Sequence, residues 1–328
     1  MLDANPNQVQ SWSDSTLSPN TPTPTPLVLI HDGGGTTFGY FLLGNLNRSV
    51  YAIHNPNYIT GQPWAGGMDE MARTYLKLIT DAGISGNTFL GGWSLGGLLA
   101  VTMARMLAYQ TVPEAKNIIV TGIVMIDSPF HIPRIKDEAI PDAEPPDLPA
   151  LVKNCLAQCK DLLNVWELPR WDDAASSARE TRCRLKSNDW TIPPQHVLHV
   201  PVIGDPSIQR VGRYINEARQ SEKVRVDKDT TSIQAHQNHR SPPTAALLRA
   251  TEPVPPNDPT KGRVRTDRWR HELLLGWDER YPEFIKAVID LESHHYNIFE
   301  HKKTEVVTAK INEALEILEG RAEKLVSD

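Results

Sequence analysis

Two kinds of apolar spacing alternate along the chain from residue 27 to about residue 129. Short runs of consecutive apolar residues predict buried strands, and longer segments with apolar residues at helical spacing predict helices between them. Strands that alternate with helices through short connections predict an α/β fold, with a mostly parallel sheet covered by helices on both faces. The strands predicted here are Leu27–Ile30, Val50–Ile53, Thr88–Leu90 and Asn117–Ile126, and the helices are Phe38–Leu46, Met68–Ala82 and Leu98–Tyr109.

This alternation stops at about residue 130 and returns at about residue 243. The segment between is rich in proline, and its spacing predicts two helices, Leu148–Trp166 and Ile208–Gln220. Long insertions in compact domains are usually functional, and active-site lids are common among them. We therefore expect a mainly helical lid over residues 130–242, with an independent helical domain as the alternative. After it, the pattern predicts the strands Ala245–Ala250 and Phe284–Leu291 and the helices Asp267–Tyr281 and Thr304–Val326.

Residues 1–26 have a different composition, rich in Pro, Thr, Ser and Asn and ending in a Thr-Pro repeat. Such a segment buries too little apolar surface to order itself, which predicts a disordered tail or linker. The expected organisation is therefore a tail over residues 1–26, a core built from residues 27–129 and 243–328, and the lid over residues 130–242.

A Gly-x-Ser-x-Gly motif, Gly92-Trp-Ser-Leu-Gly96, stands between a predicted strand and a predicted helix. This context resembles the strand-to-helix turn on which α/β-hydrolases expose a nucleophilic serine. Side chains at Gly92 and Gly96 would collide with the neighbouring strand and helix in so tight a bend. The motif therefore predicts an α/β-hydrolase fold with Ser94 as the nucleophile.

A serine hydroxyl needs a neighbouring base, and that base needs an anchoring carboxylate. In this fold the chain order is Ser, then Asp or Glu, then His. Asp127 ends the strand after the nucleophile helix, and His295 follows the last predicted strand, so both side chains are expected at the sheet edge that carries Ser94. We favour Asp127 as the acid because it follows a strongly apolar strand directly. The alternatives are Glu252 or Asp258 for the acid, and His294 or His31 for the base.

Hydrolysis of an acyl group passes through an intermediate with a negatively charged oxygen, which backbone N–H groups stabilise. The Leu95 N–H is the expected first donor, because it follows the nucleophile at a helix N-terminus. The second is expected from the glycine-rich loop after the first core strand, at Gly33 or Gly34. Glycines there let the backbone approach a ligand closely.

Three segments resemble the signatures of polyketide and peptide synthase thioesterase domains: Gly92-Trp-Ser-Leu-Gly-Gly97, Ile126-Asp-Ser-Pro129 and His295-Tyr-Asn-Ile-Phe299. Two further segments, Leu247–Pro253 and Leu274–Tyr281, are similar to fungal polyketide synthase thioesterases in particular. The resemblance supports Asp127 as the acid, favours His295 over His294 as the base, and places Trp93 among the substrate-binding residues. It implies release of an acyl chain from the phosphopantetheine thiol of an acyl carrier protein through an acyl-Ser94 ester. Water or a small-molecule acceptor then takes the acyl group.

Composition bears on the possible partners, the location and the cofactors of the protein. The chain has 328 residues, and its net charge of -6 gives no indication of nucleic-acid binding. No apolar run is long enough to span a membrane and no secretory signal is found, so a soluble cytoplasmic protein is expected. The three cysteines are not spaced as zinc ligands, and neither metal nor cofactor is expected. The alternative functions are a carrier-independent carboxylesterase and a catalytically inactive binding protein of the same fold.

Overall fold

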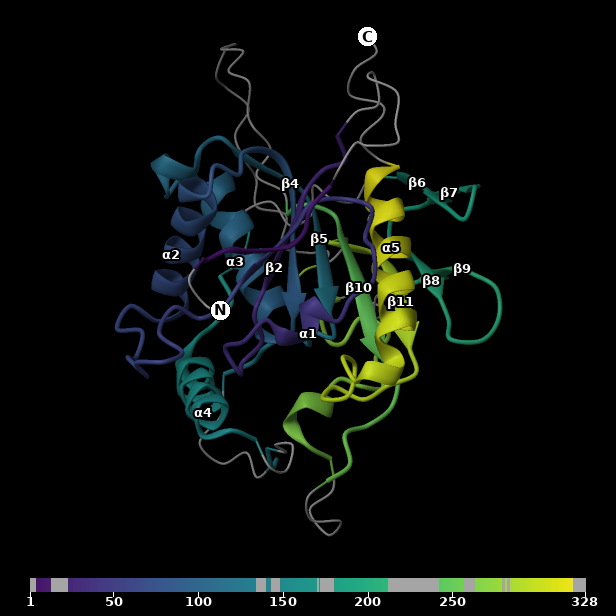
Figure 1. Ribbon diagram of the computed structural model, residues 1–328. Coiled ribbons are helices and arrows are strands. Elements are labelled where there is room, and N and C mark those ends of the chain that lie inside the picture. The colour runs from purple at the N-terminus through teal and green to yellow at the C-terminus, as the bar shows by residue number, and fades with distance from the viewer. Residues whose placement is uncertain are drawn as a thin grey trace, which may run out of the picture.

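The computed structural model describes residues 4–12, 23–133, 140–142, 148–169, 171, 180–211, 242–256, 263–278, 281 and 284–320. Nine strands form the main sheet, in the order β1-β3-β2-β4-β5-β10-β11-β8-β9 (Figure 1). The seven inner strands, from β3 to β8 in that order, are parallel, while β1 and β9 are antiparallel edge strands. The strands are β1 Asn7–Gln10, β2 Leu27–Ile30, β3 Val50–Ile53, β4 Gly86–Trp93, β5 Ile118–Ile126, β8 His196–Val200, β9 Ser207–Arg210, β10 Ala245–Ala250 and β11 Ile285–Leu291.

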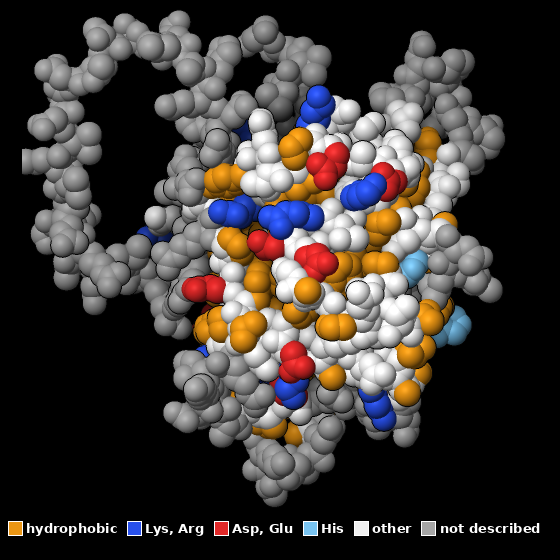
Figure 2. Space-filling view, turned by 90° about the vertical axis from the view of Figure 1, so that its left-hand side faces the viewer, with side chains coloured by type: hydrophobic (Ala, Val, Ile, Leu, Met, Phe, Trp, Pro, Cys, Tyr) orange, Lys and Arg blue, Asp and Glu red, His pale blue; other side chains and the backbone are white. Residues whose placement is uncertain are grey.

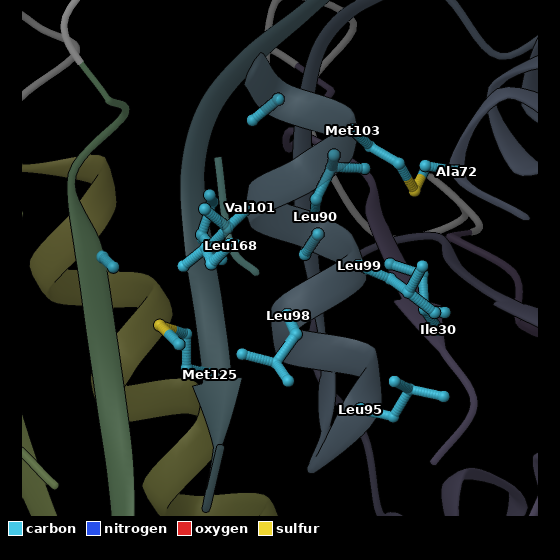
Figure 3. Packing of buried hydrophobic residues seen from close by; sticks show 14 of the residues in the cluster. Ile30, Ala72, Leu90, Leu95, Leu98, Leu99, Val101, Met103, Met125 and Leu168 are labelled. Carbon is cyan, nitrogen blue, oxygen red and sulfur yellow. The ribbon is translucent and has the colours of Figure 1, made fainter. Parts of the chain in front are cut away.

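Helices cover both faces of this sheet, as the sequence predicts. On one face lie α2 (Gly67–Asp81) and α3 (Leu95–Ala108), and on the other lies α5 (Thr304–Glu319) (Figure 1). α3 is buried on nearly all sides because it lies between the sheet and α2, as the side chains of Leu98, Leu99 and Met103 show in Figure 3. Burying a side chain of this size stabilises the fold by about 1.5–3 kcal/mol. The start of α3, which follows Ser94, is therefore held rigidly.

The N-terminal segment differs from the expected tail over residues 1–26. Asn7–Gln10 forms β1 and pairs with β3, and the side chain of Gln10 donates to the Gly44 carbonyl and accepts from the Leu46 N–H. An edge strand needs backbone partners rather than a fully apolar face, so this polar sequence is compatible with the open side of β3. Residues 13–22 of the expected tail lie outside the described residues.

The segment over residues 130–242 is not mainly helical in its described part. One predicted helix is present as α4 (Ala150–Val165), which lies beyond the carboxyl ends of the strands (Figure 1). Residues 180–211, however, form the hairpin of β6 (Thr181–Leu185) and β7 (Asn188–Ile192) and then β8 and β9 of the main sheet. The alternation of buried and exposed residues along β6 is the period of a strand. This part of the expected lid therefore belongs to the core.

Three predicted helices were wrong in whole or in part. The helix expected from Ile208 begins inside β9, and its residues from 212 onward lie outside the described chain. In the described part of the segment expected as the helix Asp267–Tyr281, a 3₁₀ turn is followed by further turns, and a helix could not continue past Leu275 and Gly276, where φ is 48° and 83°. The helix expected at Phe38–Leu46 is the single turn α1 (Phe38–Phe41).

Two surface properties bear on the partners of the protein. The described helices are all too short or too polar to cross a lipid bilayer. On the face that carries α2, basic side chains stand among acidic ones, so neither sign of charge dominates the described part of that face (Figure 2).

Candidate active site

Ser94 lies on a sharp turn between β4 and α3. Its φ and ψ of 56° and -116° are strained for a residue with a side chain, and its N–H is anchored to the Ile126 carbonyl at 2.9 Å. A Cβ on Gly92 would lie 2.5 Å from the Ile30 carbonyl oxygen, and one on Gly96 would lie 2.3 Å from the same atom. These collisions confirm the reason that the sequence gives for both glycines. The turn leaves the hydroxyl at the carboxyl edge of the sheet.

The structure brings Ser94, His295 and Asp127 together from the ends of three different strands. His295 Nε2 lies 3.0 Å from Ser94 Oγ, and His295 Nδ1 lies 2.7 Å from Asp127 Oδ2. Because an ionised carboxylate only accepts hydrogen bonds, Nδ1 carries the proton and Nε2 is left to accept from the serine hydroxyl. His295 and Asp127 are both buried. This is the geometry of a nucleophile, a general base and an orienting acid.

The alternative residues lie elsewhere or have other partners. Glu252 is exposed after β10, and His294 receives the Tyr296 N–H rather than facing Ser94. The His31 ring contacts the Tyr75 hydroxyl and the Asp32 carbonyl, and burial lowers its pKa to about 4. His31 is therefore a neutral side chain that fixes the loop after β2. Asp258 lies outside the described residues.

Asp127 has partners that the sequence analysis missed. Arg270 Nη2 donates to Asp127 Oδ2 at 2.9 Å and Nη1 donates to Oδ1, while the Ala250 N–H also donates to Oδ1 at 3.0 Å. Burial alone would raise the pKa of Asp127, but the charge of Arg270 and the hydrogen bonds from His295 and Arg270 outweigh it and hold that pKa well below its usual range. The carboxylate therefore stays ionised. The only local signal for Arg270 is its spacing of three residues from Asp267, to which it is also paired.

The amides expected to bind an oxyanion are divided between two neighbouring cavities. Leu95 and Gly33 line the cavity that contains Ser94 and His295. Gly34 lines a second cavity instead, and its N–H is a hydrogen-bond partner of the Asp32 carboxylate. Leu95 and Gly33 are thus the pair of expected donors that lie beside the nucleophile, and Gly34 has another partner.

The two cavities meet at Asp32, Leu156 and Tyr296, which line both. The rim of the first includes cationic side chains, and the wall of the second is largely aromatic. α4 contributes lining residues to both cavities and also packs apolar side chains against the core. The cationic residues of the first cavity are Lys160, Arg265 and Arg268, and the aromatic residues of the second are Phe38, Tyr40, Tyr58, Trp93, Tyr296 and Phe299.

Trp93, expected among the substrate-binding residues, lies between the second cavity and the base. Its ring centroid is 5.6 Å from that of His295 and 5.4 Å from that of Phe299. Its backbone N–H donates to the Tyr40 hydroxyl at 2.9 Å, and that hydroxyl donates to the Ile30 carbonyl at 2.7 Å. Tyr40, which the sequence analysis did not single out, thus ties β4 to β2 directly below the nucleophile.

Asp32 carries an energetic cost that can be measured. Burial raises its pKa to about 6, against the hydrogen bond from the Gly34 N–H and the charge of His295. Because the folded protein binds this proton more tightly than the unfolded chain, the free energy of unfolding falls as the pH rises from about 4 to about 6. We expect Asp32→Asn to raise the free energy of unfolding by about 1–2 kcal/mol at pH 8 and by little at pH 3.5.

Denaturant unfolding at both pH values measures this difference. Asp205→Asn is the control, since Asp205 is exposed between β8 and β9 and its replacement should change neither value. A loss of stability at pH 8 in Asp32→Asn would contradict the assigned cost of ionisation.

A mostly parallel sheet with a serine on a strained strand-to-helix turn is the arrangement of α/β-hydrolases. Residues 25–163 match the family described as "Thioesterase domain". The chain is 39% identical over 317 residues to "Probable thioesterase KK1J" of Curvularia clavata, with 96% of each chain covered. It is 40% identical over 325 residues to "Probable thioesterase lcsE" of Purpureocillium lilacinum, with 97% of each covered. The chain therefore belongs to the thioesterase family.

The fold is also similar to that of a solved structure. "A high-resolution crystal structure of covalent complex of NocB thioesterase domain with fluorophosphonate nocardicin G analog" aligns with a TM-score of 0.51 at 17% identity, covering 89% of this chain and 95% of that one. At this identity the likeness concerns the fold.

Proposed function

We propose that this chain is a serine thioesterase or acyltransferase of secondary metabolism, which releases a polyketide-type acyl chain from a carrier-protein thioester. The observation that carries the proposal is the 3.0 Å contact between Ser94 Oγ and His295 Nε2, with Asp127 on the far side of the imidazole. Membership of the thioesterase family supports the thioester as the substrate bond.

In the first half of the reaction, Ser94 Oγ attacks the thioester carbonyl while His295 Nε2 takes the hydroxyl proton. The carbonyl oxygen becomes an oxyanion, for which we propose the N–H groups of Leu95 and Gly33 as donors. Each such donor typically contributes roughly 3–4 kcal/mol to lowering the barrier. The carbon–sulfur bond then breaks, the proton passes from His295 to the departing thiolate, and the acyl group remains on Ser94 as an ester.

In the second half, an acceptor attacks the acyl-Ser94 ester with His295 as the base again. Water gives a free acid, and a hydroxyl or amine gives an ester, lactone or amide. A dry, shaped cavity disfavours water. The aromatic cavity beside Trp93, which α4 helps to line, supports an apolar acyl chain as the group that is held during this step.

The test compares two substrates for the same nucleophile: an acyl chain loaded on an acyl carrier protein, and the p-nitrophenyl ester of the same acid. We expect the carrier-bound chain to react with at least tenfold higher kcat/KM. The mass of the intact protein should show one added acyl group, and peptide masses after digestion should place that group on Ser94. Equal turnover of the ester with indifference to the carrier would favour a carrier-independent esterase. Absence of an acyl adduct and of turnover would favour a binding protein.

A further inference from the structure

A chain of buried charges extends from the proposed triad into the protein, away from Ser94. Asp127 pairs with Arg270, and Arg270 Nε donates to Asp267 Oδ1 at 3.0 Å. The side chains of Asp127, Arg270 and Asp267 are 0%, 7% and 1% exposed, so solvent screens these charges little.

Each group in this chain has directed partners. Both oxygens of Asp127 accept from the Arg270 guanidinium, and Oδ2 also accepts from His295 Nδ1 at 2.7 Å. Arg270 Nη1 donates as well to the Ala250 carbonyl at 2.7 Å, and Asp267 Oδ2 accepts the Val254 N–H at 2.6 Å. Because a guanidinium is planar and presents its N–H groups in a fixed fork, it fixes both the position and the plane of the carboxylate.

We propose that Arg270 and Asp267 are positioning residues that set how strongly His295 holds its proton, by adjusting the charge that Asp127 presents to the imidazole. This inference rests on the proposed function only in taking His295 as the base for Ser94. An unpaired Asp127 carboxylate would stabilise the imidazolium with its full charge. Arg270 offsets part of that charge, and Asp267, on the opposite side of the guanidinium, restores part of it.

The two positioning residues therefore have opposite effects on one imidazole. Loss of the Arg270 charge makes the surroundings of Asp127 more negative and favours the protonated imidazole. Loss of the Asp267 charge leaves Arg270 with a single carboxylate partner and disfavours the protonated imidazole. A merely structural ion pair would lower stability in both variants without moving the imidazole in opposite directions.

Other charged groups near the imidazole are unchanged in both variants. Asp32, from the loop after β2, interacts with the His295 charge across the cavity. Glu300 and Lys303, at the start of the last helical segment, act on the neighbouring His294, as does Glu252. Besides Asp32, the charged or titratable side chains that line the same cavity as His295 include His131, Asp142, Lys160, Arg265 and Arg268.

The test measures the second-order rate of Ser94 labelling by a fluorophosphonate from pH 4.5 to pH 9. In this reaction the Oγ–P bond forms, the P–F bond breaks with release of fluoride, and His295 accepts the hydroxyl proton, so the acid limb of the profile reports protonation of the imidazole. We expect Arg270→Gln to move the midpoint of that limb upward by about one pH unit, and Asp267→Asn to move it downward by about half a unit. Arg270→Lys keeps the charge without the fork, so its midpoint should stay near that of the unaltered protein while its rate falls.

The control is a second buried ion pair outside the site. Arg249 on β10 forms a bidentate ion pair with Asp290 on β11, and their side chains are 14% and 7% exposed. Arg249→Gln should lower thermal stability and leave the acid limb in place. If Arg270→Gln does not fold, the other two variants still test the inference. Asp267→Asn keeps the guanidinium and should shift the midpoint downward, and Arg270→Lys keeps the positive charge and should leave the midpoint in place.

Shifts in the same direction, or unmoved limbs in folded variants, would overturn the inference. The fluorophosphonate reacts without a carrier protein. A finding that the enzyme does not distinguish carrier-bound substrates would therefore contradict the proposed substrate, while the labelling experiment could still be interpreted. Failure of the unaltered protein to label at all would overturn both.

Discussion

Ser94→Ala is expected to reduce turnover of any acyl substrate by on the order of 10⁴- to 10⁶-fold while the protein stays folded. The substitution removes the hydroxyl that we propose as the nucleophile. His295→Ala is expected to cost a similar factor, because Oγ then loses the imidazole that lies 3.0 Å away. The double variant should be little worse than either single one, since the two groups act as a unit.

Initial rates with a p-nitrophenyl ester, together with thermal unfolding of each variant, measure these effects. Ser207→Ala is the matched control, because Ser207 is exposed at the start of β9 and its loss should leave the rate unchanged. Residual turnover of Ser94→Ala within tenfold of the unaltered protein would show that another group is the nucleophile.

The residues of this site that the sequence predicts are those whose position follows from neighbouring residues in the chain. Ser94 is recognisable because a strand, two glycines and a helix start surround it within a few residues. Asp127 and His295 are found because the carboxyl ends of parallel strands converge at one edge. Their contact joins residues 168 positions apart, yet Asp127 directly follows β5 and His295 comes four residues after β11, and both strands have clear apolar runs.

The part that sequence missed depends on contacts with no local pattern. Arg270 reaches Asp127 across 143 positions, and it stands in a segment whose Trp and Leu spacing predicts a helix. That segment turns instead at Leu275 and Gly276, where φ is positive. β1 and β9 were missed for a related reason, since an edge strand is chosen by the backbone that is free to pair with it. Tertiary pairing decides these elements, and local propensity does not.

These two kinds of residue perform different tasks in the same site. Ser94 directly follows β4 and begins α3, so the sheet and the helix place it with little freedom. The loop that carries Asp127 is held by partners from β10 and from residues 263–278. Asp127 has a positive φ of 41°, an unfavourable conformation that this surrounding network maintains. The orientation of the Asp127 carboxylate therefore depends on Arg270 and Ala250, partners that no local sequence pattern indicates.

Asp127→Asn is accordingly expected to lower kcat/KM by on the order of 10³- to 10⁴-fold. An asparagine side chain turned to receive the Nδ1 proton through its oxygen must present its NH₂ group to Arg270, and the reverse orientation presents NH₂ to His295. The first orientation sets two donors, the asparagine NH₂ and the Arg270 guanidinium, against each other. The second opposes the tautomer in which Nε2 is free to accept from Ser94. The fold should lose stability as well, because Arg270 is left buried with a single carboxylate, that of Asp267.

Glu252→Gln is the comparison, because it makes the same change at the rival acid. Glu252 is exposed beyond the end of β10, and its N–H is bound to the Ser293 carbonyl at 3.0 Å. We expect its kcat/KM to stay within about twofold of the unaltered protein, as for a surface substitution. Rates with one p-nitrophenyl ester at pH 8, together with thermal unfolding of each variant, separate catalysis from misfolding. If Glu252→Gln were the damaging change and Asp127→Asn the mild one, the acid would belong one strand later and the contact between Asp127 and His295 would be structural.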